Sequence, residues 1–197
     1  MPNTNPNAMP NYRHGISNAV VAMQTAVGTY GTPWNEVGAE SVEVSPAERN
    51  SSTFYSDNAK PATVNGARGN KTINVQFANF SKDFRTNCFG HTIDKTTGAV
   101  VESDDDEGGT FAFGYEVQGT IGPIRVWQLG CTTSDPSHSF QTDGDNATES
   151  PDTATFTING DVISGKQRST LTCNKGDAGF DTFLSAVPTA VTEDDGE

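Results

Sequence analysis

Residues 88–109, CFGHTIDKTTGAVVESDDDEGG, hold the side chains of this sequence that are best suited to chemistry. Cys88 stands three residues before His91, and five carboxylates lie between residues 102 and 107. A cysteine close to an imidazole base is the arrangement of a covalent nucleophile. Cysteine, histidine and carboxylates are also the ligands of zinc sites. Both possibilities depend on the elements that place these residues.

A helix over residues 79–90, NFSKDFRTNCFG, is predicted to place the cysteine. The segment begins with an asparagine and a serine that can cap a helix and ends with a glycine that can terminate one. Phe80, Phe84 and Cys88 recur every four residues and form one apolar stripe. We therefore expect Cys88 to be a small core residue and not a nucleophile.

The other polar groups of this stretch also have structural explanations. His91 follows the helix-ending glycine, where an imidazole can bond to the last free carbonyls. The acids at 102–107 are nearly contiguous, whereas calcium loops space their ligands at alternate positions around a glycine turn. We expect no catalytic residue and no metal site here, and a solvated acidic loop instead.

Three further motifs are incomplete. The segment DGDNATESPDTA, residues 143–154, starts like a calcium loop, but Ala147 and Ala154 stand at two ligand positions. The segment GARGNKT, residues 66–72, has two residues between its glycines where a phosphate loop needs four. His14, His91 and His138 complete no Ser-His-Asp order. The sequence specifies neither an enzyme nor a cofactor.

Composition points to a mainly β protein with large polar loops. The 197 residues include only three leucines, against fifteen valines and twenty-five threonines. The net charge of −13 disfavours capture of nucleic acid phosphates, although it also fits plain solubility or adaptation to high salt. The three cysteines include no CxxC pair, and no apolar run reaches the length of a membrane span. We expect synthesis in a reducing cytoplasm.

One domain is expected over residues 16–191, between a mobile arm at 1–15 and a disordered acidic tail at 192–197. Alternating Val, Ile and Phe predict strands near residues 18–27, 41–45, 72–77, 110–118, 124–133, 154–163 and 169–174. The spacing of apolar residues at 180–187 is helical. Residues 46–70 show no sustained period, and a loop of this length is usually functional or forms an interface.

Charge is unevenly distributed along the chain. Residues 49–85 carry a net +4, whereas residues 99–161 carry a net −11. The unevenness can arise by chance. It also fits a protein with one face complementary to another, and such heterologous contacts close into rings or extend as filaments.

Several stretches resemble, in order, the major tail tube proteins of long, non-contractile-tailed bacteriophages. They are VEVSPAE with TFYSDNAK, then TINVQFANFSKDFRTNCFGHTIDKTTGAVV, then the hairpin FAFGYEVQG...IRVWQLGC. The resemblance covers about residues 38–172. Phe89 departs from the usual leucine before Gly-His, Cys131 occupies a position where charged or aromatic residues are common, and the strand after Phe140 is hard to align.

The resemblance implies an antiparallel β-sandwich of two packed sheets with one short flanking helix. It implies hexameric rings that stack around a tape-measure protein into a tube for DNA, together with distal tail and tail terminator proteins as partners. The location implied is the virion tail, after assembly in the host bacterial cytoplasm, and GHTIDKTTG would be a structural link there.

The long loop at 46–70 corresponds to the segment that reaches between rings in this family, where it would face an acidic loop of the next ring. Glu116, on a hairpin strand, is a candidate for the lumen wall, where carboxylates would repel DNA phosphates. The candidate ring-contact residues are Arg49, Phe54, Tyr55, Lys60, Arg68, Asp104, Asp105 and Asp106.

Two alternatives stay open. A monomeric β-sandwich that binds carbohydrate or a cell surface would share the polar loops and the acidic surface, and Trp34 and Trp127 would then form part of an aromatic platform. Within the tail tube resemblance, another tail or connector protein on the same sandwich fits as well.

Overall fold

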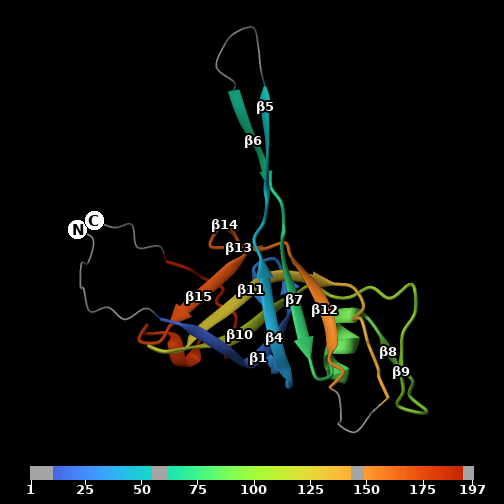
Figure 1. The fold of residues 1–197 in the computed structure, drawn as a ribbon. Helices are drawn as coiled ribbons and strands as arrows, with labels where there is room; N and C mark the ends of the chain where they lie inside the picture. The colour runs from blue at the N-terminus through green and yellow to red at the C-terminus, as the bar shows by residue number, and fades with distance from the viewer. Residues whose placement is uncertain (1–10, 55–61, 143–148, 193–197) are drawn as a thin grey trace.

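The computed structural model describes residues 11–54, 62–142 and 149–192 of the chain. One antiparallel sheet dominates it (Figure 1). The strands follow the order β2-β1-β10-β11-β12-β7-β4, with β3 paired to β1 and β15 paired to β11. These strands are β1 (Arg13–Ala26), β2 (Thr29–Tyr30), β3 (Trp34–Asn35), β4 (Ala39–Ser45), β7 (Lys71–Phe77), β10 (Phe111–Gly119), β11 (Ile124–Thr133), β12 (Asp152–Ile158) and β15 (Thr170–Asn174).

Three two-stranded hairpins stand beside this sheet in the described part of the chain. They are β5 (Arg49–Phe54) with β6 (Ala62–Arg68), β8 (Thr92–Ile93) with β9 (Val100–Val101), and β13 (Asp161–Ile163) with β14 (Lys166–Arg168).

A bend in β11 turns the sheet into two layers. The first half of β11 pairs with β15, from Ile124 opposite Asn174 onward, and its end pairs with β12, where Cys131 lies opposite Ile158. Gly130 between them has φ of 61°, and a Cβ there would lie 2.2 Å from the Gly160 carbonyl oxygen. Glycine is therefore required at the bend. The expected mainly β sandwich fold is confirmed, and its two layers are parts of one continuous sheet.

Aromatic side chains fill the space between the layers. Alternate residues of β7 and β10 point inward, as the sequence pattern predicted. Phe84 of the helix stacks on Phe156 of β12 with 5.8 Å between ring centroids, and it meets Phe111 edge to face at 5.6 Å. Tilted and edge-to-face rings stabilise a core beyond simple area burial.

The predicted helix is present as α1 (Lys82–Phe84) continued by a π-helical turn (Arg85–Phe89), beside β12 in Figure 1. The Ser81 hydroxyl accepts a hydrogen bond from the Phe84 N–H at 3.1 Å and caps the start. Gly90 ends the helix with φ of 89°. Cys88 is fully buried in the main core, as expected.

A second apolar cluster lies on the outer face of β1, β10 and β11. Trp127 and Leu129 are at its centre, and Val187 covers them from the C-terminal segment. Residues 180–187 form only one turn of regular helix, η2 (Phe180–Thr182), although their spacing is helical. A single turn suffices because this segment lies on a sheet that buries its apolar residues.

Two boundaries differ from the sequence expectations. Residues 13–15 of the expected N-terminal arm belong to β1, while residues 1–10 and 193–197 lie outside the described residues. The stretch 46–70, expected to lack regular structure, contains the β5–β6 hairpin. The sequence did not reveal this hairpin because residues 46–70 show no apolar alternation.

Candidate assembly surfaces

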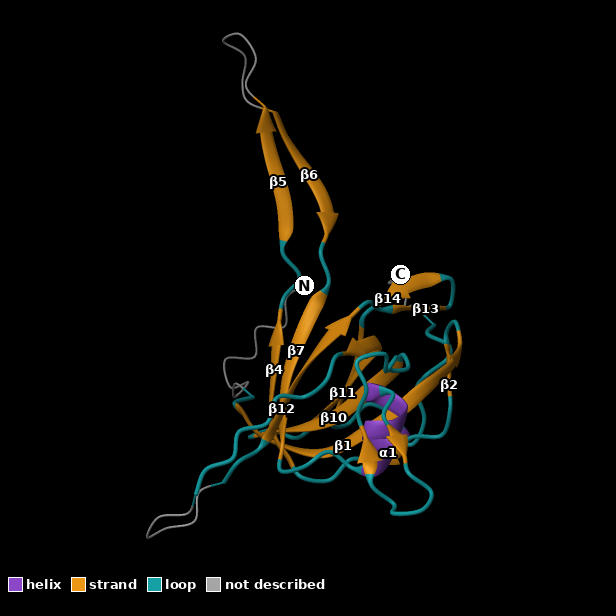
Figure 2. Cartoon of the chain, turned by 90° about the vertical axis from the view of Figure 1, so that its right-hand side faces the viewer, coloured by secondary structure: helices purple, strands orange, loops and turns teal. Residues whose placement is uncertain are grey.

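The β5–β6 hairpin projects far from the sandwich (Figures 1 and 2). It continues the adjacent strands β4 and β7, and the Gly69 N–H donates to the Glu48 carbonyl at 3.0 Å across its base. An isolated two-stranded hairpin is marginally stable in water. An arm of this kind gains stability when another surface covers it.

Three predicted contact residues lie on the strands of this arm. Arg49 and Arg68 are cross-strand partners at its base, and Phe54 is the last residue of β5. Tyr55 and Lys60 lie outside the described residues. The structure thus brings the two arginine positions together, although they are nineteen residues apart in the sequence.

The acidic residues lie in the connection between β9 and β10. Asp104 and Asp105 are exposed in a turn, and the half-buried Asp106 accepts a hydrogen bond from the Ser103 N–H at 2.9 Å. The Gly109 N–H donates to the Asn87 carbonyl at 3.0 Å, which ties the loop to the helix. Strands β8 and β9 extend to the right in Figure 1, away from the β5–β6 arm. A contact between arm and loop would therefore join two copies of the chain.

Glu116, the candidate for the lumen wall, is buried and paired. It is 6% exposed, and its Oε2 accepts from Arg125 Nε at 2.7 Å. Burial raises its pKa, but hydrogen bonds from Arg125 and Gln118 and the arginine charge outweigh burial and hold the pKa below its usual value. Its place in a lumen remains a prediction, and its charge is already paired within the chain.

Arg125 also fixes the C-terminal segment. Its Nη1 donates to the carbonyls of Phe180 and Asp181, and its guanidinium lies 4.3 Å from the centre of the Phe180 ring. The group combines hydrogen bonds with a cation–π contact.

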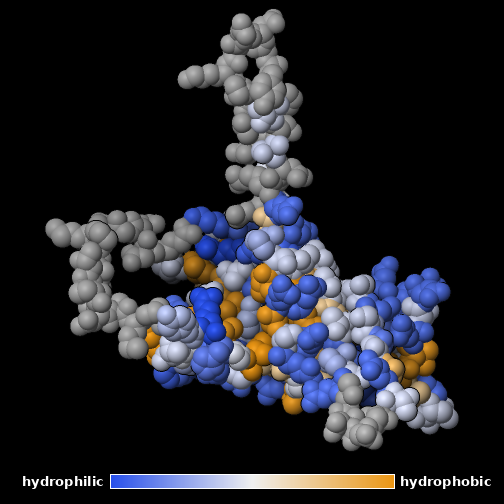
Figure 3. All heavy atoms as spheres, viewed as in Figure 1, coloured by the Kyte–Doolittle hydropathy of each residue, from blue (hydrophilic) through white to orange (hydrophobic). Residues whose placement is uncertain are grey.

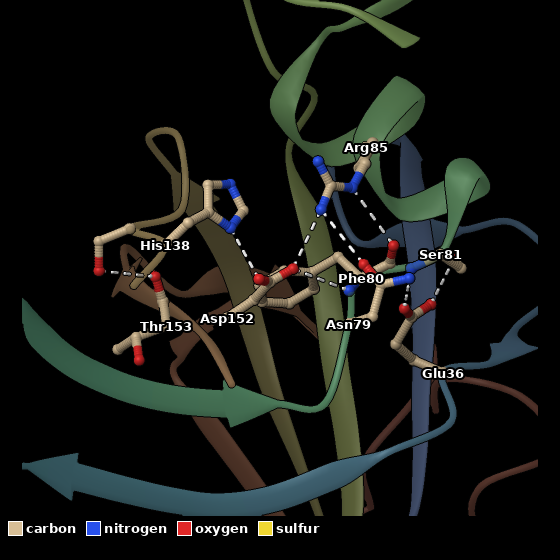
Figure 4. A network of polar contacts seen from close by, with 9 residues as sticks. Glu36, Asn79, Phe80, Ser81, Arg85, His138, Asp152 and Thr153 are labelled. Carbon is tan, nitrogen blue, oxygen red and sulfur yellow. Dashed lines mark hydrogen bonds and ion pairs between the residues drawn. The ribbon is translucent and has the colours of Figure 1, made fainter. Parts of the chain in front are cut away.

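A polar network that the sequence analysis missed holds the helix to the sheet (Figure 4). The Asp152 carboxylate, at the start of β12, accepts from Arg85 Nη2 at 3.0 Å and from the Phe80 N–H at 3.3 Å, and it lies 2.7 Å from His138 Nδ1. Glu36 accepts from the Ser81 N–H and hydroxyl, both at 2.7 Å. A His–Asp pair also occurs in hydrolases, but this aspartate is occupied by the arginine and the helix start.

The residues of the opening stretch are placed as follows. Burial raises the pKa of the Cys88 thiol, which favours the protonated form. The sequence analysis expected the His91 imidazole to bond to the helix carbonyls, but the ring contacts Asp135 instead. The backbone N–H of His91 donates to the Arg85 carbonyl. One oxygen each of Glu102 and Asp135 lies within 4.8 Å of an imidazole nitrogen of His91.

A hollow with a mixed polar and apolar lining opens below the base of the arm. It has a volume of about 270 Å³, and its lining residues include Arg13 of β1, Lys71 of β7, Val44, Tyr115 and Val126. Figure 3 shows apolar residues on this face beneath the arm. Val44 is 40% exposed, so part of this surface remains for a partner to cover.

The tryptophans form no exposed platform. Trp127 is fully buried, and its Nε1 donates to the Phe183 carbonyl at 2.8 Å. Trp34 is partly buried against the main core and donates to Glu36 at 3.3 Å. The feature that would have favoured a carbohydrate-binding module is thus missing at these two positions. No helix in the described ranges is long and apolar enough to cross a membrane.

Comparisons with known proteins give one family. The family model described as "Phage tail tube protein" matches residues 15–187. A search of curated proteins finds no match. Among solved structures, the chain is similar to one from the "Cryo-EM structure of the anti-feeding prophage (AFP) baseplate, 6-fold symmetrised", with 7% identity, a TM-score of 0.46, and coverage of 84% of this chain and 97% of that one. At that TM-score the structural likeness carries no further argument.

Proposed function

Because the chain belongs to the phage tail tube protein family, we propose that it assembles into the stacked rings of a tail tube that conducts DNA. The family supports a structural part in the virion. A hexameric ring, stacking and passage of DNA go beyond that and are proposed from the resemblance.

The observation that carries the proposal is the projecting β5–β6 arm. It stands clear of the sandwich, and its base carries Arg49 and Arg68 opposite one another. The acidic turn at Asp104 and Asp105 is exposed elsewhere on the molecule. An arm and a complementary surface on different sides of one chain form a heterologous contact, which propagates from copy to copy.

Net charge fits passage of DNA. Each copy carries −13, so six copies carry about −78 before counterions bind. A negative wall repels phosphates and lets DNA slide without adhering. The tape-measure, distal tail and tail terminator proteins are the proposed partners, and the virion tail, assembled in the host cytoplasm, is the proposed location.

Electron microscopy of the purified protein across a salt series tests the proposal. We expect hollow rings or tubes at low salt and fewer tubes at high salt, because salt screens exposed charges beyond about 10 Å at 0.1 M. Monomers under every condition, also after addition of the other tail proteins, would contradict self-assembly and favour a monomeric binding module.

A further inference from the structure

We propose that His91, Glu102 and Asp135 form a binding site for a divalent transition-metal ion of the Zn²⁺ class. The three residues come from separate segments: the link after the helix, the β9–β10 loop and the β11–β12 connection. Each offers one ligand atom, and the three atoms lie within 4.8 Å of one another. This inference does not depend on the proposed tube assembly.

The place brings two carboxylates and one imidazole together. Asp135 Oδ1 lies 3.0 Å from His91 Nε2. The exposed Glu102 carboxylate has no hydrogen-bond or ion-pair partner among the described residues, yet it lies close to the Asp135 carboxylate. Two carboxylates held close together repel each other, and a divalent cation between them would offset that repulsion.

The histidine ring supplies the second observation. Its side chain is 1% exposed, and Nδ1 is buried without a hydrogen-bond partner among the described residues. Nε2 is the ring nitrogen that faces Asp135 Oδ1, at 3.0 Å, so it is the atom that would bind an ion shared with that carboxylate. Packing against Phe89, 5.5 Å between ring centroids, holds the ring in place.

The ligand set selects the type of ion. One imidazole nitrogen and two carboxylate oxygens suit Zn²⁺ and related ions, with water completing the coordination on the exposed side. Ca²⁺ and Mg²⁺ prefer a full set of oxygen ligands. The sequence did not predict this site because the spacing of residues 102–107 was judged by itself. Only one of the three ligands comes from that run.

A bound ion would fix the acidic loop. Glu102 lies two residues before Asp104, and Asp135 is anchored where β11 leaves the sheet. Coordination would connect the loop that presents Asp104 and Asp105 to the sandwich and so reduce its freedom before it meets a partner.

Metal binding by the full-length chain tests the inference, after removal of metals with a chelator. We expect calorimetry to give one Zn²⁺ per chain, and Co²⁺ to give the visible absorption of a low-symmetry protein site. The exposed ligands allow variants that should still fold: Glu102→Gln with Asp135→Asn should weaken Zn²⁺ binding by more than about tenfold and abolish the Co²⁺ spectrum. Mg²⁺ should not compete at equal concentration.

The double variant Asp104→Asn with Glu107→Gln is the matched control, since it also removes two carboxylates, both from the β9–β10 loop that carries Glu102. It should bind Zn²⁺ like the unchanged protein. Equal loss of binding in both double variants would show unspecific attraction to an acidic surface and would overturn the site. An unchanged isotherm after loss of Glu102 and Asp135 would overturn it as well.

Discussion

Arg49 and Arg68 occupy directly opposite positions at the base of the β5–β6 arm. Like charges at opposed positions of an antiparallel pair disfavour the pairing. In the proposed assembly, a negative surface of a second copy would offset the like charge of these two positions.

Reversal of both charges tests the electrostatic part of the assembly. Arg49→Glu with Arg68→Glu should leave the chain folded and should raise the protein concentration needed for tubes, because the acidic loop would then face acidic residues. Sedimentation and electron microscopy measure this concentration. The exposed pair Lys95→Glu with Lys175→Glu makes the same change in net charge and should have a smaller effect. Equal effects of the two pairs would show that net charge alone governs tube formation and would contradict a specific contact of Arg49 and Arg68.

Asp152 is expected to be important for stability. Asp152→Ala would leave the Arg85 guanidinium without its carboxylate and the Phe80 N–H without an acceptor. Loss of one partner of a buried ion pair costs about 3–5 kcal/mol, and the partial exposure of Arg85 favours the lower end. Urea denaturation measures the free energy of unfolding. Asp105→Ala, at an exposed turn position, should change it by less than about 0.5 kcal/mol.

The lowered pKa of Glu116 predicts that the free energy of unfolding decreases in acid. Its pKa in the folded chain lies below the ordinary value of 4.5, so the carboxylate contributes stability above that pH and loses the contribution as pH falls through the folded pKa. The difference in free energy of unfolding between the unchanged protein and Glu116→Gln should be full at pH 7 and shrink below about pH 4.5. Glu43→Gln, at an exposed position, is the control. A difference that stays constant into acid would contradict this origin.

Local patterns in the sequence predicted much of the fold. The cap, the apolar stripe and Gly90 defined the helix, and alternation from Phe111 to Val117 placed β10 with Glu116 on the face opposite Tyr115. Nothing local showed that the C-terminal segment covers that opposite face, so the sequence did not reveal that Glu116 is buried.

Long-range features were not predictable in this way. Asp152 meets Arg85 across sixty-seven residues, and His91 meets Asp135 across forty-four. These contacts depend on how the sheet bends at Gly130. The β5–β6 arm was missed for another reason, because its strands project from the core and carry no apolar period.

Removal of the arm tests the central claim most directly. Strands β4 and β7 are antiparallel neighbours, and the Glu48 carbonyl already accepts from the Gly69 N–H, so an Asn-Gly turn can replace residues 49–68. Circular dichroism and melting should show a folded sandwich like that of the full chain. Electron microscopy at low salt should then show tubes from the full chain and none from the shortened one. Tubes of normal length and diameter from a folded, armless chain would contradict the account.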